Sequence, residues 1–189
     1  MAALDSLLHL LDLEPLEQTL FRGQSQSYGA KRVFGGQVLA QSVIAAGRTV
    51  EAGRRCHSLH AYFILAGEAN APIVYQVENL RDGGSFTTRR VTAIQHGRPI
   101  FNAALSFHLD EEGLDHAVPM PEAPDPEGVL GEDELARRVE HLIPERFRET
   151  LTSERAVDYR PVNPVDPFAP EATDAELEVW LRANGELPE

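Results

Sequence analysis

The hydrophobic positions divide the first part of the chain into helical and extended segments. Four leucines between Leu4 and Leu11 recur at i, i+3, i+4 and i+7, which predicts a helix that Pro15 limits. A short strand is predicted at 20–25, and residues 33–47 then form an uncharged run of fifteen residues. That run is too long for most strands and too short to cross a bilayer, so it predicts a helix. Because it is apolar nearly all round, we expect it to be buried all round.

Four strand candidates follow in close order, at 57–65, 72–80, 85–95 and 98–109. The last alternates most clearly, with Phe, Ala and Leu on one face and mostly polar residues on the other. Asp82-Gly83 and His96-Gly97 suit tight hairpins, so neighbouring strands are expected to be antiparallel. The simplest way to bury the helix is to curl this sheet around it. The predicted class is therefore α+β, a hot-dog fold, in which an antiparallel sheet wraps around a central buried helix.

Beyond Leu109 the chain becomes rich in proline and acid. Glu132–Ile143 is predicted to be a helix, closed by Pro144, and 177–183 reads as a strand. The predicted domains are an N-terminal hot-dog domain at 1–112, a proline-rich linker with a short helix at 113–174, and the first strand of a truncated second hot-dog repeat at 175–189.

Composition and charge narrow the classes of function. Residues 1–109 carry a net charge of +2 and residues 110–189 carry −15. The acidic total argues against general nucleic-acid binding, which requires a basic face. Cys56 is the single cysteine, which excludes an internal disulfide. No basic segment precedes the N-terminal leucines, which argues against a secretory signal, so a cytoplasmic location is the default expectation.

The start of the uncharged helix holds the main candidate site. Gly35, Gly36 and Gln37 lie there, and the N–H groups of a helix N-terminus bind anions or a polarised carbonyl oxygen. The two glycines equally suit close packing of the helix against a strand, and both interpretations stay open. Arg90 is a further candidate, for an anionic ligand. The alternative for Arg90 is a cross-strand pair with an acid such as Glu78.

Other reactive side chains have plainer interpretations. His57 and His60 are three apart on a predicted strand, which places them on opposite faces and argues against one shared metal ion. Cys56 stands beside two arginines that would lower the pKa of its thiol, but we expect a partly buried, inert thiol.

Several motifs resemble the N-terminal half of the acyl-CoA thioesterase II family, and they run in order from Leu4 to Gly185. They are Phe21-Arg22-Gly23-Gln24-Ser25, Val33-Phe34-Gly35-Gly36-Gln37-Val38, His57-Ser58-Leu59-His60-Ala61-Tyr62-Phe63, Arg81-Asp82-Gly83-Gly84-Ser85-Phe86, Arg89-Arg90-Val91, Gly97-Arg98-Pro99-Ile100-Phe101 and Val179-Trp180-Leu181-Arg182-Ala183-Asn184-Gly185.

The resemblance implies a double hot-dog enzyme of lipid metabolism that hydrolyses fatty acyl-CoA to a free fatty acid and CoA. It implies no metal or redox cofactor, and a water activated by a set of Asp, Thr (or Ser) and Gln. That set belongs to the second hot-dog repeat, and no position of this sequence matches it. We therefore assign no catalytic residue, and expect a fragment or a truncated gene product.

Two hypotheses about function follow from the resemblance, beside a third option, a non-functional remnant that neither binds a ligand nor folds stably. In the first, the chain is the N-terminal portion of a thioesterase. In the second, it is a non-catalytic module that binds acyl-CoA or acts as a scaffold. Because a lone hot-dog sheet leaves apolar surface and a strand edge exposed, we expect a homo-oligomer or pairing with a second hot-dog domain.

Overall fold

The computed structural model describes residues 2–26, 31–166 and 168–188. The chain forms two compact units. The sheet unit comprises residues 8–114, and the acidic unit comprises the described residues among 1–7 and 115–189. In the described part of the chain, no helix combines the length and the apolar character that crossing a bilayer requires.

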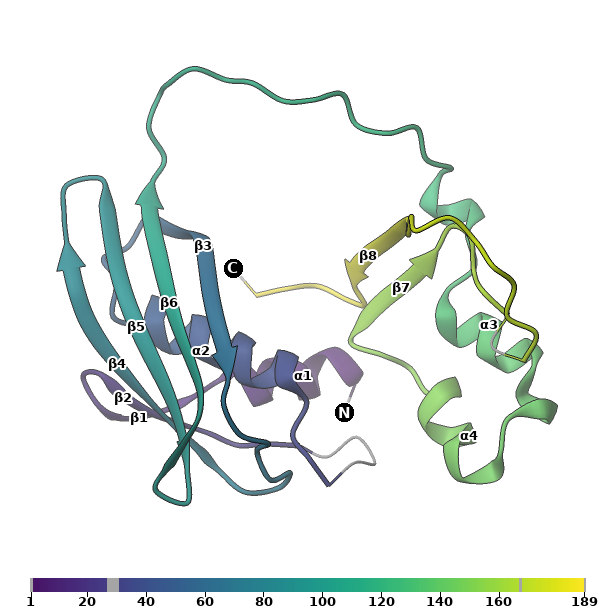
Figure 1. The fold of residues 1–189 in the computed structure, drawn as a ribbon, viewed down its shortest axis with the longest axis horizontal. Helices are drawn as coiled ribbons and strands as arrows, with labels where there is room; N and C mark the ends of the chain where they lie inside the picture. The colour runs from purple at the N-terminus through teal and green to yellow at the C-terminus, as the bar shows by residue number, and fades with distance from the viewer. Residues whose placement is uncertain (1, 27–30, 167, 189) are drawn as a thin grey trace. The chain divides into compact units, whose positions relative to one another are not determined.

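The sheet unit is built on one antiparallel sheet of six strands, in the order β1-β2-β4-β5-β6-β3. Helix α2 lies across one face of this sheet (Figure 1) and contacts β2, β3, β4, β5 and β6. The predicted arrangement of a central helix on an antiparallel sheet is therefore present. The elements are α1 (Ala3–Leu11), β1 (Glu14–Glu17), β2 (Leu20–Gly23), α2 (Gly35–Gly47), β3 (Arg54–Phe63), β4 (Ile73–Asp82), β5 (Phe86–Gln95) and β6 (Arg98–Leu109).

Alternation of side chains gives the sheet an inner and an outer face. On β6, Phe101, Ala103, Leu105 and Phe107 are buried toward α2, as predicted. The hairpin between β5 and β6 turns at His96 and Gly97, whose φ angles of 51° and 71° are those of a tight two-residue turn. Strand β1 was not predicted, because its Pro15 suits a strand only at an edge of a sheet.

Helix α2 is buried on one face rather than all round. Its inner face carries both apolar and polar side chains, namely Gln37, Val38, Gln41, Ser42, Ala45 and Ala46. Leu39, Val43 and Ile44 are only half-buried, although they pack against the core. The lack of charge predicted burial on every side, but within this unit the sheet covers a single side of the helix.

Gln41 joins the helix to three other segments. Its Nε2 donates to the carbonyl oxygens of Leu10 and Gln24, at 2.7 and 2.8 Å. Its Oε1 accepts a 2.6 Å hydrogen bond from the hydroxyl of Tyr75 on β4. Both side chains are fully buried. Burial raises the pKa of the Tyr75 hydroxyl far above its ordinary value, so it stays protonated and remains a donor.

The acidic unit contains more structure than the predicted linker. It has α3 (Glu132–Arg138), α4 (Glu145–Thr152), and a two-stranded sheet of β7 (Val157–Pro161) and β8 (Val179–Ala183). Helix α3 is shorter than the predicted 132–143. Helix α3 ends at Arg138, and a 3-10 turn follows at Glu140–Leu142. The turn stops before Ile143, because a residue before proline avoids the helical conformation. The predicted domain boundaries themselves stay a prediction.

One carboxylate organises the two strands of this unit. Asp158 on β7 accepts hydrogen bonds from Arg160 Nε at 2.8 Å and from Arg182 Nε, on β8, at 3.3 Å. The Asp158 and Arg160 side chains are only 14% and 16% exposed. Trp180, the only tryptophan in the sequence, donates from Nε1 to the carbonyl oxygen of Pro124 at 3.0 Å. Its fluorescence should therefore report on the acidic unit.

The buried Tyr75 hydroxyl predicts a loss of stability at alkaline pH. The unfolded chain releases this proton above pH ~10, whereas the folded chain retains it, so rising pH favours unfolding. Tyr75→Phe should weaken this pH dependence. At neutral pH the variant should lose about 1–3 kcal/mol of unfolding free energy, because Gln41 Oε1 loses its partner. Urea unfolding followed by circular dichroism measures both effects. Tyr62→Phe, at an exposed site, is the control, and an unchanged alkaline slope in Tyr75→Phe would contradict the prediction.

Asp158→Asn should destabilise the acidic unit. The amide keeps the shape of the side chain but removes the charge that two arginines share, which should cost about 1–3 kcal/mol. Asp133→Asn is the matched control, because it breaks a single ion pair, with Arg137, that is more exposed than the pair of Asp158 with Arg160. Such an exposed pair is worth at most about 1 kcal/mol. Denaturant unfolding followed by Trp180 fluorescence measures both variants. Equal losses in the two would show that Asp158 has no special role.

Candidate functional site

An apolar pocket of about 300 Å³ opens beside the start of α2. We call it the helix-start pocket. Its walls come from the N-terminus of α2, the end of β3 with the turn that follows, and one end of β6. The lining residues are Arg32, Val33, Gly35, Val38, Phe63, Ile64, Leu65, Ala66, Gly67, Ile100 and Phe101. Arg32 is the only ionisable side chain among them, so the pocket suits an apolar ligand with an anionic end.

The two predicted glycines serve close packing of aromatic rings. A Cβ on Gly35 would lie 2.9 Å from Cε1 of Phe63, and one on Gly36 would lie 2.5 Å from Cε1 of Phe34. The close approach of the helix to a strand is therefore observed at Gly35. Among the described residues, neither glycine N–H has a hydrogen-bond acceptor, as expected in the first turn of a helix. Ligand binding by Gly35 and Gly36 stays a prediction.

Gln37 is already engaged within the fold. Its side chain is 6% exposed. It accepts a hydrogen bond from the N–H of Gln26 and donates to the carbonyl oxygen of Gln24, both at 3.2 Å. Its own N–H donates to the carbonyl oxygen of Phe34. These contacts position the segment after β2, so substrate binding by Gln37 also stays a prediction.

The structure does not bring Arg90 together with the glycines. Arg90 lies on the outer face of the sheet, opposite Glu78 on β4, with 3.4 Å between Nη1 and Oε2. This is the cross-strand pair that formed the alternative interpretation. The arginine at the pocket is Arg32, which the sequence analysis did not select. Among the described residues Arg32 forms no ion pair. The sequence feature that could have identified Arg32 is its position, one residue before the uncharged run.

The two histidines lie on one face of the sheet, which corrects the prediction of opposite faces. A β-bulge between Cys56 and Ser58 breaks the alternation of β3. His57 then bonds Ser106 at 2.8 Å, and His60 lies opposite Ala104, both outer-face residues of β6. Even so, the described residues contain no group of three side chains arranged to hold a metal ion.

The thiol of Cys56 is exposed rather than partly buried. Desolvation by burial nevertheless raises its pKa, and this outweighs a backbone hydrogen bond at Ser58 that lowers the pKa. The thiol is therefore mostly protonated at neutral pH, as expected of an inert cysteine.

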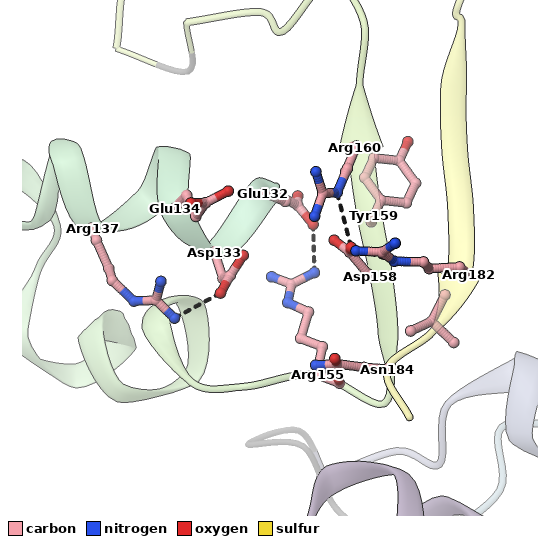
Figure 2. A pocket seen from close by; sticks show the side chains of 11 residues that line it. Glu132, Asp133, Glu134, Arg137, Arg155, Asp158, Tyr159, Arg160, Arg182 and Asn184 are labelled. Carbon is pink, nitrogen blue, oxygen red and sulfur yellow. Dashed lines mark hydrogen bonds and ion pairs between the residues drawn. The ribbon is translucent and has the colours of Figure 1, made fainter. Parts of the chain in front are cut away.

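A second pocket, of about 270 Å³, lies in the acidic unit and is lined by charged side chains (Figure 2). Arg137 pairs with Asp133 at 2.6 Å, and Arg155 pairs with Glu132. The guanidinium groups of Arg160 and Arg182 both reach Asp158, and Arg182 also reaches Glu127 at 2.7 Å. Because each of these arginines already has a carboxylate partner, the cluster has no spare cation for an anionic ligand. Its evident role is to hold the unit together.

Comparison with known proteins connects the sheet unit to a family. The family described as "Acyl-CoA thioesterase N-terminal domain" matches residues 24–108. Acyl-CoA thioesterase 2 of Haemophilus influenzae is 39% identical over 185 residues, which cover 98% of this chain and 65% of that protein. Human acyl-coenzyme A thioesterase 8 is 36% identical, over 95% of this chain and 59% of its own length. The chain thus spans about two thirds or less of these relatives.

Solved structures agree on the fold. The acyl-CoA thioesterase II TesB2 from Mycobacterium marinum superposes with a TM-score of 0.71 at 38% identity, covering 97% of this chain and 62% of that one. A hot-dog protein of unknown function from Alicyclobacillus acidocaldarius has a TM-score of 0.73 at 20% identity, with 95% and 62% covered, which supports the fold alone. The sheet unit has the hot-dog fold, and its residues 24–108 belong to the acyl-CoA thioesterase N-terminal domain family.

Proposed function

We propose that this chain forms the acyl-CoA-binding N-terminal part of a thioesterase that hydrolyses fatty acyl-CoA to a free fatty acid and CoA. The observation that carries the proposal is the helix-start pocket, which lies within the residues that match the thioesterase domain. An acyl chain fits its apolar walls, and Arg32 at the pocket offers a cation to the phosphates of CoA. The N–H groups of Gly35 and Gly36, which have no acceptor among the described residues, offer donors to a thioester oxygen.

The group that activates water is proposed to come from outside these 189 residues. The described residues that line the helix-start pocket include no carboxylate and no histidine, so they supply no general base. We therefore propose that the Asp, Thr (or Ser) and Gln set implied by the family belongs to a second hot-dog repeat. The relatives are longer than this chain, which is consistent with that division.

The strand edge of β3 is the proposed contact for a second hot-dog domain, whether on the same polypeptide or on another copy. Strand β3 ends the sheet, and its other edge pairs with β6. Tyr62 and Phe63 on it are 64% and 61% exposed. An unpaired edge with exposed aromatic side chains favours association.

The alternative function is a module that binds acyl-CoA without hydrolysing it. The pocket without a general base favours this alternative for the 189 residues taken alone. Calorimetric titration with decanoyl-CoA and an assay of CoA thiol release separate the two. Binding without turnover, followed by turnover once a second hot-dog domain of the family is joined, supports the thioesterase. Binding without turnover in both forms supports the module, and no binding in either form rejects both.

Arg32→Ala should weaken decanoyl-CoA binding by roughly tenfold, because it removes the cation at the pocket. The loss should shrink at high salt, since exposed charges are screened. Arg90→Ala is the matched control, because Arg90 lies on the outer face and pairs with Glu78. Titration calorimetry at two salt concentrations measures both variants. A larger loss from Arg90→Ala than from Arg32→Ala would place the phosphate contact on the wrong face for this proposal.

A further inference from the structure

The side chain of Phe63 occupies the gap between the sheet and the start of α2. Phe63 is the last residue of β3 and lies opposite Phe101 on β6. The two rings meet edge to face, with 5.0 Å between their centroids. On its other side the Phe63 ring lies against Gly35, where a Cβ would stand only 2.9 Å from its Cε1. The ring therefore forms a wall of the helix-start pocket, between a strand and the helix.

The two rings differ in how firmly the fold holds them. Phe101 is fully buried and belongs to the core, so it is a fixed part of the pocket. Phe63 is 61% exposed. Its removal frees the space that the ring occupies between Phe101 and Gly35, without creating a cavity inside the core. Phe63 is therefore a side chain whose size changes the pocket while the fold stays intact.

The volume of the pocket limits what it can hold. At roughly 30 Å³ for a water-sized group, about 300 Å³ holds on the order of ten heavy atoms. This corresponds to the tail of a medium-chain acyl group. A long-chain tail exceeds the space, and its additional methylenes gain nothing unless they leave water.

We propose that Phe63 determines acyl-chain length by closing the helix-start pocket, so that medium-chain acyl thioesters bind in preference to long-chain ones. This inference rests on the proposed acyl-CoA binding. Gly35 is the second part of the device, because only a residue without a Cβ lets the ring lie against the helix. The pair therefore predicts two substitutions with opposite effects on chain length.

Tyr62 provides a matched control for Phe63. It is the preceding residue on the same strand and is exposed to nearly the same extent, 64%. It lies on the outer face, where its ring meets that of His60 at 4.8 Å, and it does not line the pocket. A general effect of removing an exposed aromatic ring from this edge strand would appear in both variants.

The test is calorimetric titration of the full 189-residue chain with hexanoyl-, decanoyl- and palmitoyl-CoA, each below its micelle concentration. The native chain should bind decanoyl-CoA more tightly than hexanoyl-CoA, and palmitoyl-CoA no more tightly than decanoyl-CoA. Phe63→Ala should raise affinity for palmitoyl-CoA relative to decanoyl-CoA by roughly tenfold. Gly35→Ala should lower the affinity for decanoyl-CoA toward that for hexanoyl-CoA. Tyr62→Ala should leave all ratios unchanged.

The outcomes separate this inference from the proposed function. If the native chain binds the three thioesters but Phe63→Ala, folded by circular dichroism, keeps the native ratios, the role of Phe63 is rejected and acyl-CoA binding stands. If Tyr62→Ala changes the ratios as much as Phe63→Ala, the role of Phe63 is also rejected. If the native chain binds none of the three, the proposed function fails, and this inference fails with it.

Discussion

The packing of α2 on the inner face of the sheet is the constraint on which the rest of the structure depends. Apolar burial alone would let such an uncharged helix slide or rotate, since hydrophobic contacts have no direction. Gln41 removes that freedom, because its amide must meet the Tyr75 hydroxyl and the carbonyl oxygens of Leu10 and Gln24 together. A buried polar group without partners is costly, so the satisfied arrangement is strongly preferred. The position of the helix start, and hence of the pocket beside it, follows from this anchoring.

The two faces of the sheet give charged residues different surroundings. These surroundings decide which charges are paired within the fold and which remain available to a ligand. Arg89 and Arg90 are neighbours on β5, yet they have different surroundings. Arg89 is 1% exposed and bonds Thr49, Asp82 and backbone carbonyl oxygens, so its charge is fully used inside the fold. Arg90 meets Glu78 on the outer face. Arg32, at the helix-start pocket, forms no ion pair among the described residues, so its charge is available to a ligand there.

The acidic unit is held together by different interactions from those of the sheet unit. Its two-stranded sheet leaves Val157 and Leu181 exposed, and a two-stranded sheet of this size is marginal in water. Ion pairs around Asp158 and the bond from Trp180 to Pro124 supply the cross-links instead. The charge asymmetry of the chain thus corresponds to two modes of stabilisation, apolar packing in the sheet unit and polar contacts in the acidic unit. The helix-start pocket, with its apolar lining, belongs to the sheet unit.

Local sequence determined the elements whose pattern is regular, and tertiary structure decided the rest. The uncharged run predicted α2, alternation predicted β6, and His96-Gly97 predicted the hairpin, because each signal lies within a few residues. Close packing was one of the two interpretations left open for Gly35, but its partner Phe63 is distant in sequence and meets it only in the folded chain. His57 and His60 share a face because a β-bulge interrupts β3, and a prediction from strict alternation does not include such a bulge. Likewise, helix placement puts Arg32 at the pocket, and strand pairing puts Arg90 on the outer face of the sheet. Both are set by contacts between segments far apart along the chain.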